Sequence, residues 1–269
     1  FGKGFSESEV LPVQWGSSGS SGALAARFAQ FLEKRGANPF LAYVHFLDPH
    51  VPYEPAPEYQ RRFTDTPFAH PMDLYRDVRP FVPQLLAEGF GPGDPRFEDI
   101  VLRYDAEIAS TDEAIGAILK ALQSRDALDN TLIVVTADHG EEFLEHGFVE
   151  HGWTLYEEVL RVPLIFWRPG LIAARQETGR ACLCDLFPTL TTLSGVATGR
   201  TDLSGVALFD QHGASAAPRG PEEALFCHML LETRLSLHAV ICGGYKYLAS
   251  PKWLSPAECA VRSAAHAAL

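Results

Sequence analysis

The chain has 269 residues, 46% of them hydrophobic and 21% charged, which is enough to bury a substantial core. This composition excludes a fibrous, low-complexity or disordered protein. Because 22 Lys and Arg residues stand against 34 Asp and Glu, the net charge of −12 argues against nucleic acid or anionic lipid as a partner. No run of roughly 20 apolar residues predicts a membrane segment, and the N-terminal residues do not resemble a signal peptide.

The first regular element is expected after a connection rich in Gly and Ser. Residues 1–22 end in SSGSSG, a composition typical of a flexible segment. The next residues, ALAARFAQFLEKRG, place their apolar side chains on one helical stripe. Ser20 or Ser21 can cap this helix at its start, and Gly36 can end it.

The middle of the chain predicts a strand, a long loop and a long helix. Residues 39–48 (PFLAYVHFLD) are a nearly continuous apolar run, which predicts a strand covered on both faces. Residues 54–95 are rich in proline and polar residues and predict a loop with at most short helices, of a length that is more often functional than idle. Residues 97–122 predict a helix whose apolar face contains Ile108, Ile115, Leu119 and Leu122.

The second half alternates predicted strands and helices. TLIVVTADHG (residues 131–140) and VPLIFWRPG (162–170) predict buried strands, and CDLFPTLTTLSG (184–195) predicts a helix. Two further strands are expected in residues 225–232 and 237–250. This order predicts an α/β fold with a mostly parallel sheet flanked by helices and a small C-terminal antiparallel piece.

The five cysteines predict neither a disulfide framework nor a zinc knuckle. Their number is odd, and a single residue separates the only close pair. We interpret them as mostly buried, unreactive thiols: Cys182, Cys184, Cys227, Cys242 and Cys259.

Polar residues that directly follow a buried strand are the first candidates for a binding site. In open α/β sheets, ligands gather beyond the carboxyl ends of the strands. Asp138 and His139 follow TLIVVTA, where a turn lets a carboxylate and an imidazole converge on one cation. The alternative is that Asp138 caps a helix and His139 is a surface residue.

Histidines near the other predicted strand are candidate acids, bases or anion ligands, because imidazole titrates near neutral pH. His45 lies inside the apolar run and is interpreted as a core histidine. Pro49 and Pro52 restrict the backbone around His50, as a preorganised site requires.

Two more candidates, His146 and His151, are each followed by Gly, which lets the backbone approach a ligand closely. Their spacing of five excludes a helix-borne HExxH metal pair. The GxSxG, P-loop and GxGxxG motifs do not occur in the sequence. We interpret the acidic residues around the two histidines as a solvated face: Glu141, Glu142, Glu145 and Glu150.

The chain contains, in this order, PFLAYVHFLDPHVPYEP, RYDAEIASTDEAIGAILKAL, DNTLIVVTADHGEEFLEHG, HGWTLYEEVLRVPLIFWRPG and CDLFPTLTTLSG. Their order and spacing resemble the sulfatase family, within the alkaline phosphatase superfamily. The resemblance covers nearly the whole chain. It implies that residues 1–215 form the C-terminal portion of the catalytic α/β domain, and that residues 216–269 form a small, truncated antiparallel subdomain.

The resemblance also implies roles for single residues. Asp138 and His139 match the family's second pair of metal ligands, and His50 matches the histidine that contacts the sulfate and its leaving oxygen. His151 falls where members place a Lys or His that binds the transferring group, and His146 is a weaker match, as a substrate-binding residue. The implied cofactor is one divalent metal ion, Ca²⁺ first, with Mn²⁺ and Zn²⁺ as alternatives.

The chain departs from the family pattern at its start. Members carry an earlier pair of Asp ligands and a CxPSR or SxPSR nucleophile segment, and neither occurs here. We therefore expect a partial domain of a sulfatase, inactive as given, whose complete form hydrolyses a small-molecule or glycan sulfate ester. The alternatives are a phosphoester or phosphonate hydrolase, a phosphoglycerol-type transferase, or a non-catalytic remnant of the fold. The compartment (periplasmic, secreted or cytoplasmic) and the oligomeric state stay open.

Overall fold

The computed structural model describes residues 6–11, 20–66, 77–216, 219–220, 222–230 and 236–249. Most of the Gly- and Ser-rich connection and Cys259 lie outside these residues. The chain divides into two compact units. Unit 1 contains Phe1–Leu128, Phe143–Glu150 and Ser255–Leu269, and unit 2 contains Asp129–Glu142 and His151–Leu254.

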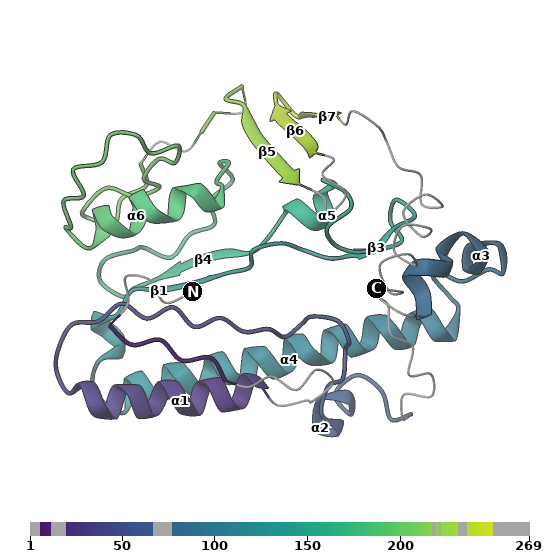
Figure 1. Ribbon diagram of the computed structural model, residues 1–269. Coiled ribbons are helices and arrows are strands. Elements are labelled where there is room, and N and C mark those ends of the chain that lie inside the picture. The colour runs from purple at the N-terminus through teal and green to yellow at the C-terminus, as the bar shows by residue number, and fades with distance from the viewer. Residues whose placement is uncertain are drawn as a thin grey trace. The chain divides into compact units, whose positions relative to one another are not determined.

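Two helices form the frame of unit 1. Helix α1 (Ser20–Arg35) packs its apolar stripe against the long helix α4 (Pro95–Gln123), as Figure 1 shows. The expected end of α1 is confirmed, because Gly36 follows it with a φ of 65°, a left-handed conformation that favours glycine. The Asp94 side chain caps α4 by accepting a hydrogen bond from the Arg96 N–H at 2.8 Å.

The described residues of the segment before α4 form short helices, as the sequence predicts. They are α2 (Pro57–Gln60), η2 (Arg79–Phe81) and α3 (Val82–Ala87). The core of unit 1 gathers side chains from this segment, from α4 and from the two-stranded sheet of β2 (Glu142–Phe143) and β3 (Val149–Glu150). Its buried members are Val51, Tyr53, Val78, Val82, Leu85, Phe90, Phe97, Ile100 and Val149.

Some expectations for unit 1 are wrong. Residues 39–48 do not form a strand, and Leu41 and Tyr43 are 71% and 65% exposed. A strand needs a hydrogen-bonded neighbour, and none of the strands in the described residues pairs with this segment. His45 is consequently exposed, with Nδ1 3.1 Å from the Tyr43 hydroxyl, and is not a core histidine. On α4, Ile108 is 43% exposed instead of facing the core.

Unit 2 begins with two strands. β1 (Ile133–Thr136) and β4 (Leu164–Trp167) pair in antiparallel register, so the expected parallel sheet is not confirmed. Parallel neighbours need a crossover of about a dozen residues or more, usually a helix. Among the described residues between β1 and β4, the only helix is the short α5 (Glu157–Leu160). The strands are also less buried than expected, since Ile165 is 55% exposed.

The rest of unit 2 follows the predicted element order. The expected helix is confirmed as α6 (Leu186–Leu193), preceded by the single turn η4 (Leu183–Asp185). Strands β5 (Leu225–Leu230), β6 (Ser236–Cys242) and β7 (Tyr245–Ala249) form the expected antiparallel sheet, in the order β5-β6-β7.

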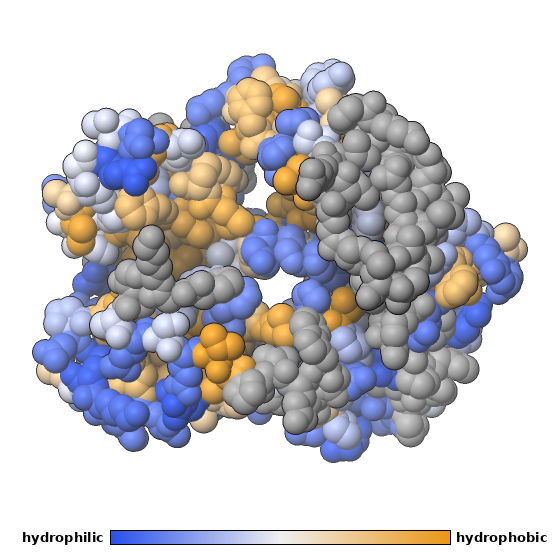
Figure 2. Space-filling model, in the orientation of Figure 1, coloured by the Kyte–Doolittle hydropathy of each residue, from blue (hydrophilic) through white to orange (hydrophobic). Residues whose placement is uncertain are grey.

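One face of this sheet is buried and the other is open. Leu237 and Ala239 pack against Leu155, whereas Phe226 and Tyr247 are 80% and 70% exposed. Figure 2 shows orange atoms of apolar residues at the surface in the region of β5 and β6. No helix in the described part of the chain combines the length and the apolar composition that a membrane span requires.

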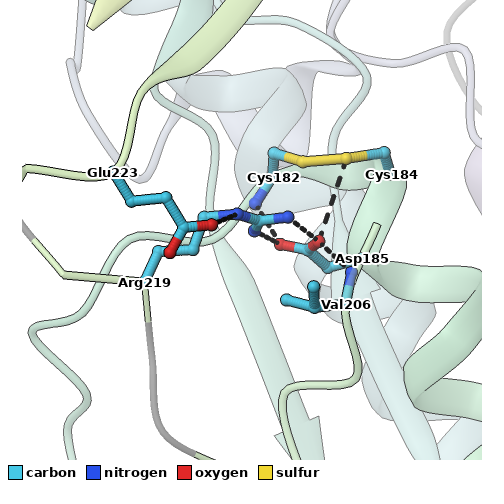
Figure 3. Close-up of a disulfide and its surroundings, with 6 residues drawn as sticks. All are labelled: Cys182, Cys184, Asp185, Val206, Arg219 and Glu223. Carbon is cyan, nitrogen blue, oxygen red and sulfur yellow. Dashed lines mark hydrogen bonds and ion pairs between the residues drawn. A yellow bond between two sulfur atoms is a disulfide. The ribbon is translucent and has the colours of Figure 1, made fainter. Parts of the chain in front are cut away.

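The interpretation of the cysteines as mostly buried thiols is wrong for the close pair. Cys182 and Cys184 form a disulfide, and Cys184 is exposed (Figure 3). The Cα atoms of the pair lie 5.4 Å apart at the start of η4, within the range that a disulfide bridges. Cys227 and Cys242 are half-buried free cysteines.

Candidate active site

The turn after β1 brings an acid and an imidazole together. Asp138 Oδ1 lies 3.7 Å from His139 Nε2 and also accepts a hydrogen bond from the His139 backbone N–H at 3.1 Å. Asp138 does not cap a helix, because the described residues that follow it form no helix before α5 (Glu157–Leu160). The two side chains therefore converge on one side of the turn.

These two residues have the chemistry of a cation site. His139 Nδ1 lies 2.8 Å from the Gly140 carbonyl oxygen, which can only accept, so Nδ1 carries the ring proton. The lone pair of Nε2 is then directed to the side of Asp138. Histidine ligands of metals usually donate their second ring N–H to a carbonyl or carboxylate in this way. The side chain of Asp138 is 71% exposed, so its oxygens are accessible to an ion.

His151 lies beside this pair in unit 2. Its ring stacks on that of His139 with 3.8 Å between centroids. Glu141 Oε1 lies 3.0 Å from His151 Nδ1, and the Glu141 side chain is almost completely buried. A carboxylate at this distance accepts a hydrogen bond from Nδ1–H and so orients the imidazole. Asp138, His139 and His151 thus form one cluster, and Glu141 is a member that the sequence analysis did not identify as a functional residue.

A glycine fixes the backbone of this cluster. The Gly140 N–H donates to the Val159 carbonyl at 2.8 Å, and a Cβ at Gly140 would lie 1.9 Å from the Glu158 carbonyl oxygen. No side chain fits at that distance, so α5 and the turn after β1 can approach only because residue 140 is glycine.

We expect Gly140→Ala to destabilise the protein by about 1–3 kcal/mol, because the backbone must shift to relieve the overlap. Gly116, inside α4, is the matched control, since nothing lies within 4 Å of its added Cβ. Gly116→Ala should instead stabilise the helix by about 0.5–1 kcal/mol. Urea unfolding measures both, and an unchanged or raised free energy of unfolding for Gly140→Ala would contradict the close approach.

His50 lies in unit 1, in a loop that α1 and α4 hold from two sides. Both peptide bonds that precede the flanking prolines, Asp48–Pro49 and Val51–Pro52, are cis. The Ser21 hydroxyl donates to Asp48 Oδ2 at 2.7 Å, and the Thr111 hydroxyl donates to the Asp48 carbonyl at 3.2 Å. His50 Nδ1 lies 2.8 Å from the Val51 carbonyl oxygen, so the same tautomer argument leaves its Nε2 as the acceptor nitrogen.

A buried carboxylic acid supports the same loop. Glu107 of α4 is 6% exposed, and its Oε1 accepts a hydrogen bond from the Glu54 N–H at 2.7 Å. Burial raises the pKa of Glu107 to about 8, and the charge of Asp48 adds to the increase, although backbone N–H groups of Glu54 and His50 oppose it. Glu107 is therefore largely protonated at neutral pH.

The raised pKa of Glu107 predicts a stability that falls with pH. The protonated acid contributes fully below its ordinary pKa of 4.5, and this contribution is lost as the pH rises through about 8. Glu107→Gln keeps the acceptor for the Glu54 N–H and cannot ionise. We expect the free energy of unfolding of this variant, taken relative to that of wild type, to rise by on the order of a few kcal/mol between pH 5 and pH 9.

Denaturant unfolding at the two pH values tests this expectation, with the exposed Glu33→Gln of α1 as the control, whose difference from wild type should not depend on pH. Parallel pH curves for Glu107→Gln and wild type would show that the acid is not buried as described.

His146 is exposed and, like His50, belongs to unit 1. The interpretation of its acidic neighbours as a solvated face is wrong, except for the exposed Glu145. Glu141, Glu142 and Glu150 are 8%, 0% and 2% exposed. Two of these buried carboxylates have a nitrogen partner, Arg79 for Glu150 at 2.9 Å and His151 for Glu141 at 3.0 Å.

The chain is similar to known proteins in sequence and in fold. The Sulfatase family model matches residues 5–196. Arylsulfatase K of Mus musculus is 32% identical over 139 residues, which cover 52% of this chain and 24% of that protein. The chain thus spans about a quarter of the length of this relative.

Two solved structures share the fold. The structure of BT4656 in complex with its substrate D-glucosamine-2-N,6-O-disulfate has a TM-score of 0.66 at 21% identity, over 86% of this chain and 60% of that one. The phosphonate monoester hydrolase of Agrobacterium radiobacter has a TM-score of 0.63 at 26% identity, over 92% of this chain and 57% of that one. The family model, the relative and the fold agree: the chain belongs to the sulfatase family.

Proposed function

We propose that this chain supplies part of the active site of a metal-dependent hydrolase of sulfate esters. The observation that carries the proposal is the cluster of Asp138, His139 and His151 on the turn and loop after β1. Its three side chains combine a cation site with a neighbouring imidazole, in a chain of the sulfatase family.

Asp138 and His139 would hold the divalent ion that the family implies. Their ligand atoms are 3.7 Å apart, which is close to the separation of two ligands on one ion. Ca²⁺ prefers oxygen ligands, and the imidazole of His139 keeps Mn²⁺ and Zn²⁺ as alternatives. When bound, the ion supplies Lewis acidity that offsets negative charge on the transferring group.

Three histidines are proposed to bind and protonate the ester. With a proton on Nε2, His151 can donate a hydrogen bond to an oxygen of the sulfate group, while Glu141 holds its ring in orientation. His50 in its protonated form can give the Nε2 proton to the leaving alkoxide, and the hydrogen bond to Val51 O keeps its ring oriented. His146 is proposed as a further contact to the substrate.

The substrate class is proposed as a sulfated sugar or a small sulfate ester. This rests on mouse arylsulfatase K as a relative and on the disulfated glucosamine bound by BT4656. We also propose that residues 1–215 belong to a catalytic domain with a mostly parallel sheet, and that residues 216–269 belong to a small antiparallel subdomain.

The second candidate function is hydrolysis of a phosphonate or phosphate ester. The structural similarity to the phosphonate monoester hydrolase and the imidazole ligand His139 favour it. Turnover of an aryl sulfate and an aryl phosphate by the protein that carries this chain separates the two. We expect a higher kcat/KM for the sulfate, and a preference for phosphate would replace the first candidate with the second.

A further inference from the structure

The Cys182–Cys184 disulfide closes a small ring at the start of η4, on a part of unit 2 that the proposed hydrolase does not use. The two cysteine residues differ in exposure. Cys184 is exposed, whereas Cys182 is half-buried. Figure 3 shows the bridge above the carboxylate of Asp185, the next residue in the chain.

Asp185 connects several segments of this part of unit 2 through its carboxylate. Its carboxylate is completely buried and accepts hydrogen bonds from the Cys182 N–H and the Val206 N–H, both at 2.9 Å. It also forms a bidentate ion pair with Arg219, which is 8% exposed and in turn contacts Glu223 at 3.2 Å. The disulfide therefore lies directly on a carboxylate that joins three separate segments of the chain.

The ion pair holds Asp185 in its charged form. Burial alone would raise the pKa of Asp185, but the bonds from Arg219, Val206 and Cys182 outweigh burial and leave it lowered. A charged carboxylate therefore lies 3.8 Å from Cys184 Sγ at all physiological pH values.

We propose that Cys182–Cys184 is a reversible thiol–disulfide exchange site, which small thiols and dithiols open by attack on Cys184. Cys184 is the more exposed of the two residues, which favours its sulfur as the one that a thiolate attacks. Attack there breaks the disulfide and expels Cys182 as the leaving group.

A dithiol can act as the reductant in this exchange. Its thiolate forms a bond to Cys184 Sγ while the Cys182–Cys184 bond breaks, and the electron pair leaves with Cys182 Sγ, which takes a proton from water. The second thiolate of the dithiol then attacks the reagent's sulfur in the mixed disulfide. This closes the cyclic disulfide of the reagent and releases the Cys184 thiolate, which takes a proton from water. The cysteines end as two thiols, and the reagent ends as a cyclic disulfide.

Opening the ring would loosen the segments that Asp185 joins. In the disulfide, the backbone around Cys182 is held so that its N–H meets Asp185 Oδ2. Reduction frees this backbone, and the Cys184 thiol gains a proton that it can donate to Asp185 Oδ1. We expect the reduced protein to unfold at a lower temperature, by about 2–4 °C.

The exchange can be followed on a single tryptic peptide. Trypsin releases residues 181–200, between Arg180 and Arg200, as one peptide that contains Cys182 and Cys184 and no other cysteine. The native chain is treated with dithiothreitol, alkylated, digested and analysed by mass spectrometry. We expect both cysteines of the peptide to be alkylated after the dithiol and neither without it.

Attack on Cys184 is tested with 2-mercaptoethanol and an alkylating agent present together, so that each released thiol is trapped. The mixed disulfide should lie on Cys184 and the alkyl group on Cys182, in at least about tenfold excess over the reverse product. Thermal unfolding with and without dithiothreitol should show the shift in wild type and in the control Cys227→Ser/Cys242→Ser, but not in Cys182→Ser/Cys184→Ser.

Three results would overturn the proposal. They are alkylation of the peptide without any reductant, reduction only after the protein is unfolded, and a mixed disulfide on Cys182.

Discussion

Asp138→Asn is expected to reduce turnover of an aryl sulfate by about 100-fold or more in the protein that carries this chain. The substitution keeps the size of the side chain but removes the negative charge that would bind the divalent ion. Loss of a residue that only supports a metal ligand typically costs about 10–100-fold, so loss of a ligand should cost at least as much. Steady-state kinetics and the metal content of the purified protein measure the two effects together.

The folded state should tolerate this substitution. The Asp138 side chain is 71% exposed, so its replacement should leave the melting temperature nearly unchanged. Asp129→Asn is the matched control, because Asp129 is exposed in the turn just before β1 and has no role in the proposed site. Near-normal turnover in Asp138→Asn, or an equal loss in both variants, would remove Asp138 from the metal site.

His151→Ala should have the second large effect, a loss of about 10²–10³ in kcat, the range associated with loss of one hydrogen-bond donor to the group on which charge develops. The reason is that His151 presents an imidazole which the buried Glu141 holds in orientation at 3.0 Å. Glu141→Gln should lose less, because an amide oxygen can still accept from His151 Nδ1, although this hydrogen bond is weaker than one to a carboxylate. Steady-state kinetics with an aryl sulfate rank the two variants.

The exposed His212→Ala of unit 2 is the control for removal of an imidazole and should keep wild-type kinetics. A value of kcat for Glu141→Gln below that of His151→Ala would contradict the account, because Glu141 is proposed to act through His151.

The sequence predicted the helices of this chain better than its sheet. Local signals decide a helix: the apolar stripe of α1, the glycine after it and the Asp cap of α4 all lie within a few residues of the ends that they define. A strand depends on a partner elsewhere in the chain. The apolar run 39–48 has the composition of a strand, yet no strand in the described residues pairs with it.

The site was predictable where residues adjoin in sequence. Asp138 and His139 follow a strand directly, and their convergence is a property of one turn. The sequence did not predict a role for Glu141, because its burial depends on tertiary packing. The acidic residues around it instead suggested a solvated surface. Glu107 could have been found: Ile100, Tyr104, Glu107, Thr111 and Ala114 have the spacing of one helical face, so a carboxylic acid lies within the inward side of α4.

The central claim is that the turn after β1 presents Asp138 and His139 to one divalent ion. Anomalous scattering from crystals of the protein that carries this chain, soaked in Mn²⁺, tests it most directly. The account predicts a peak within about 2.5 Å of both the Asp138 carboxylate and His139 Nε2. A structure in which these two side chains diverge, with the manganese bound elsewhere, would contradict it.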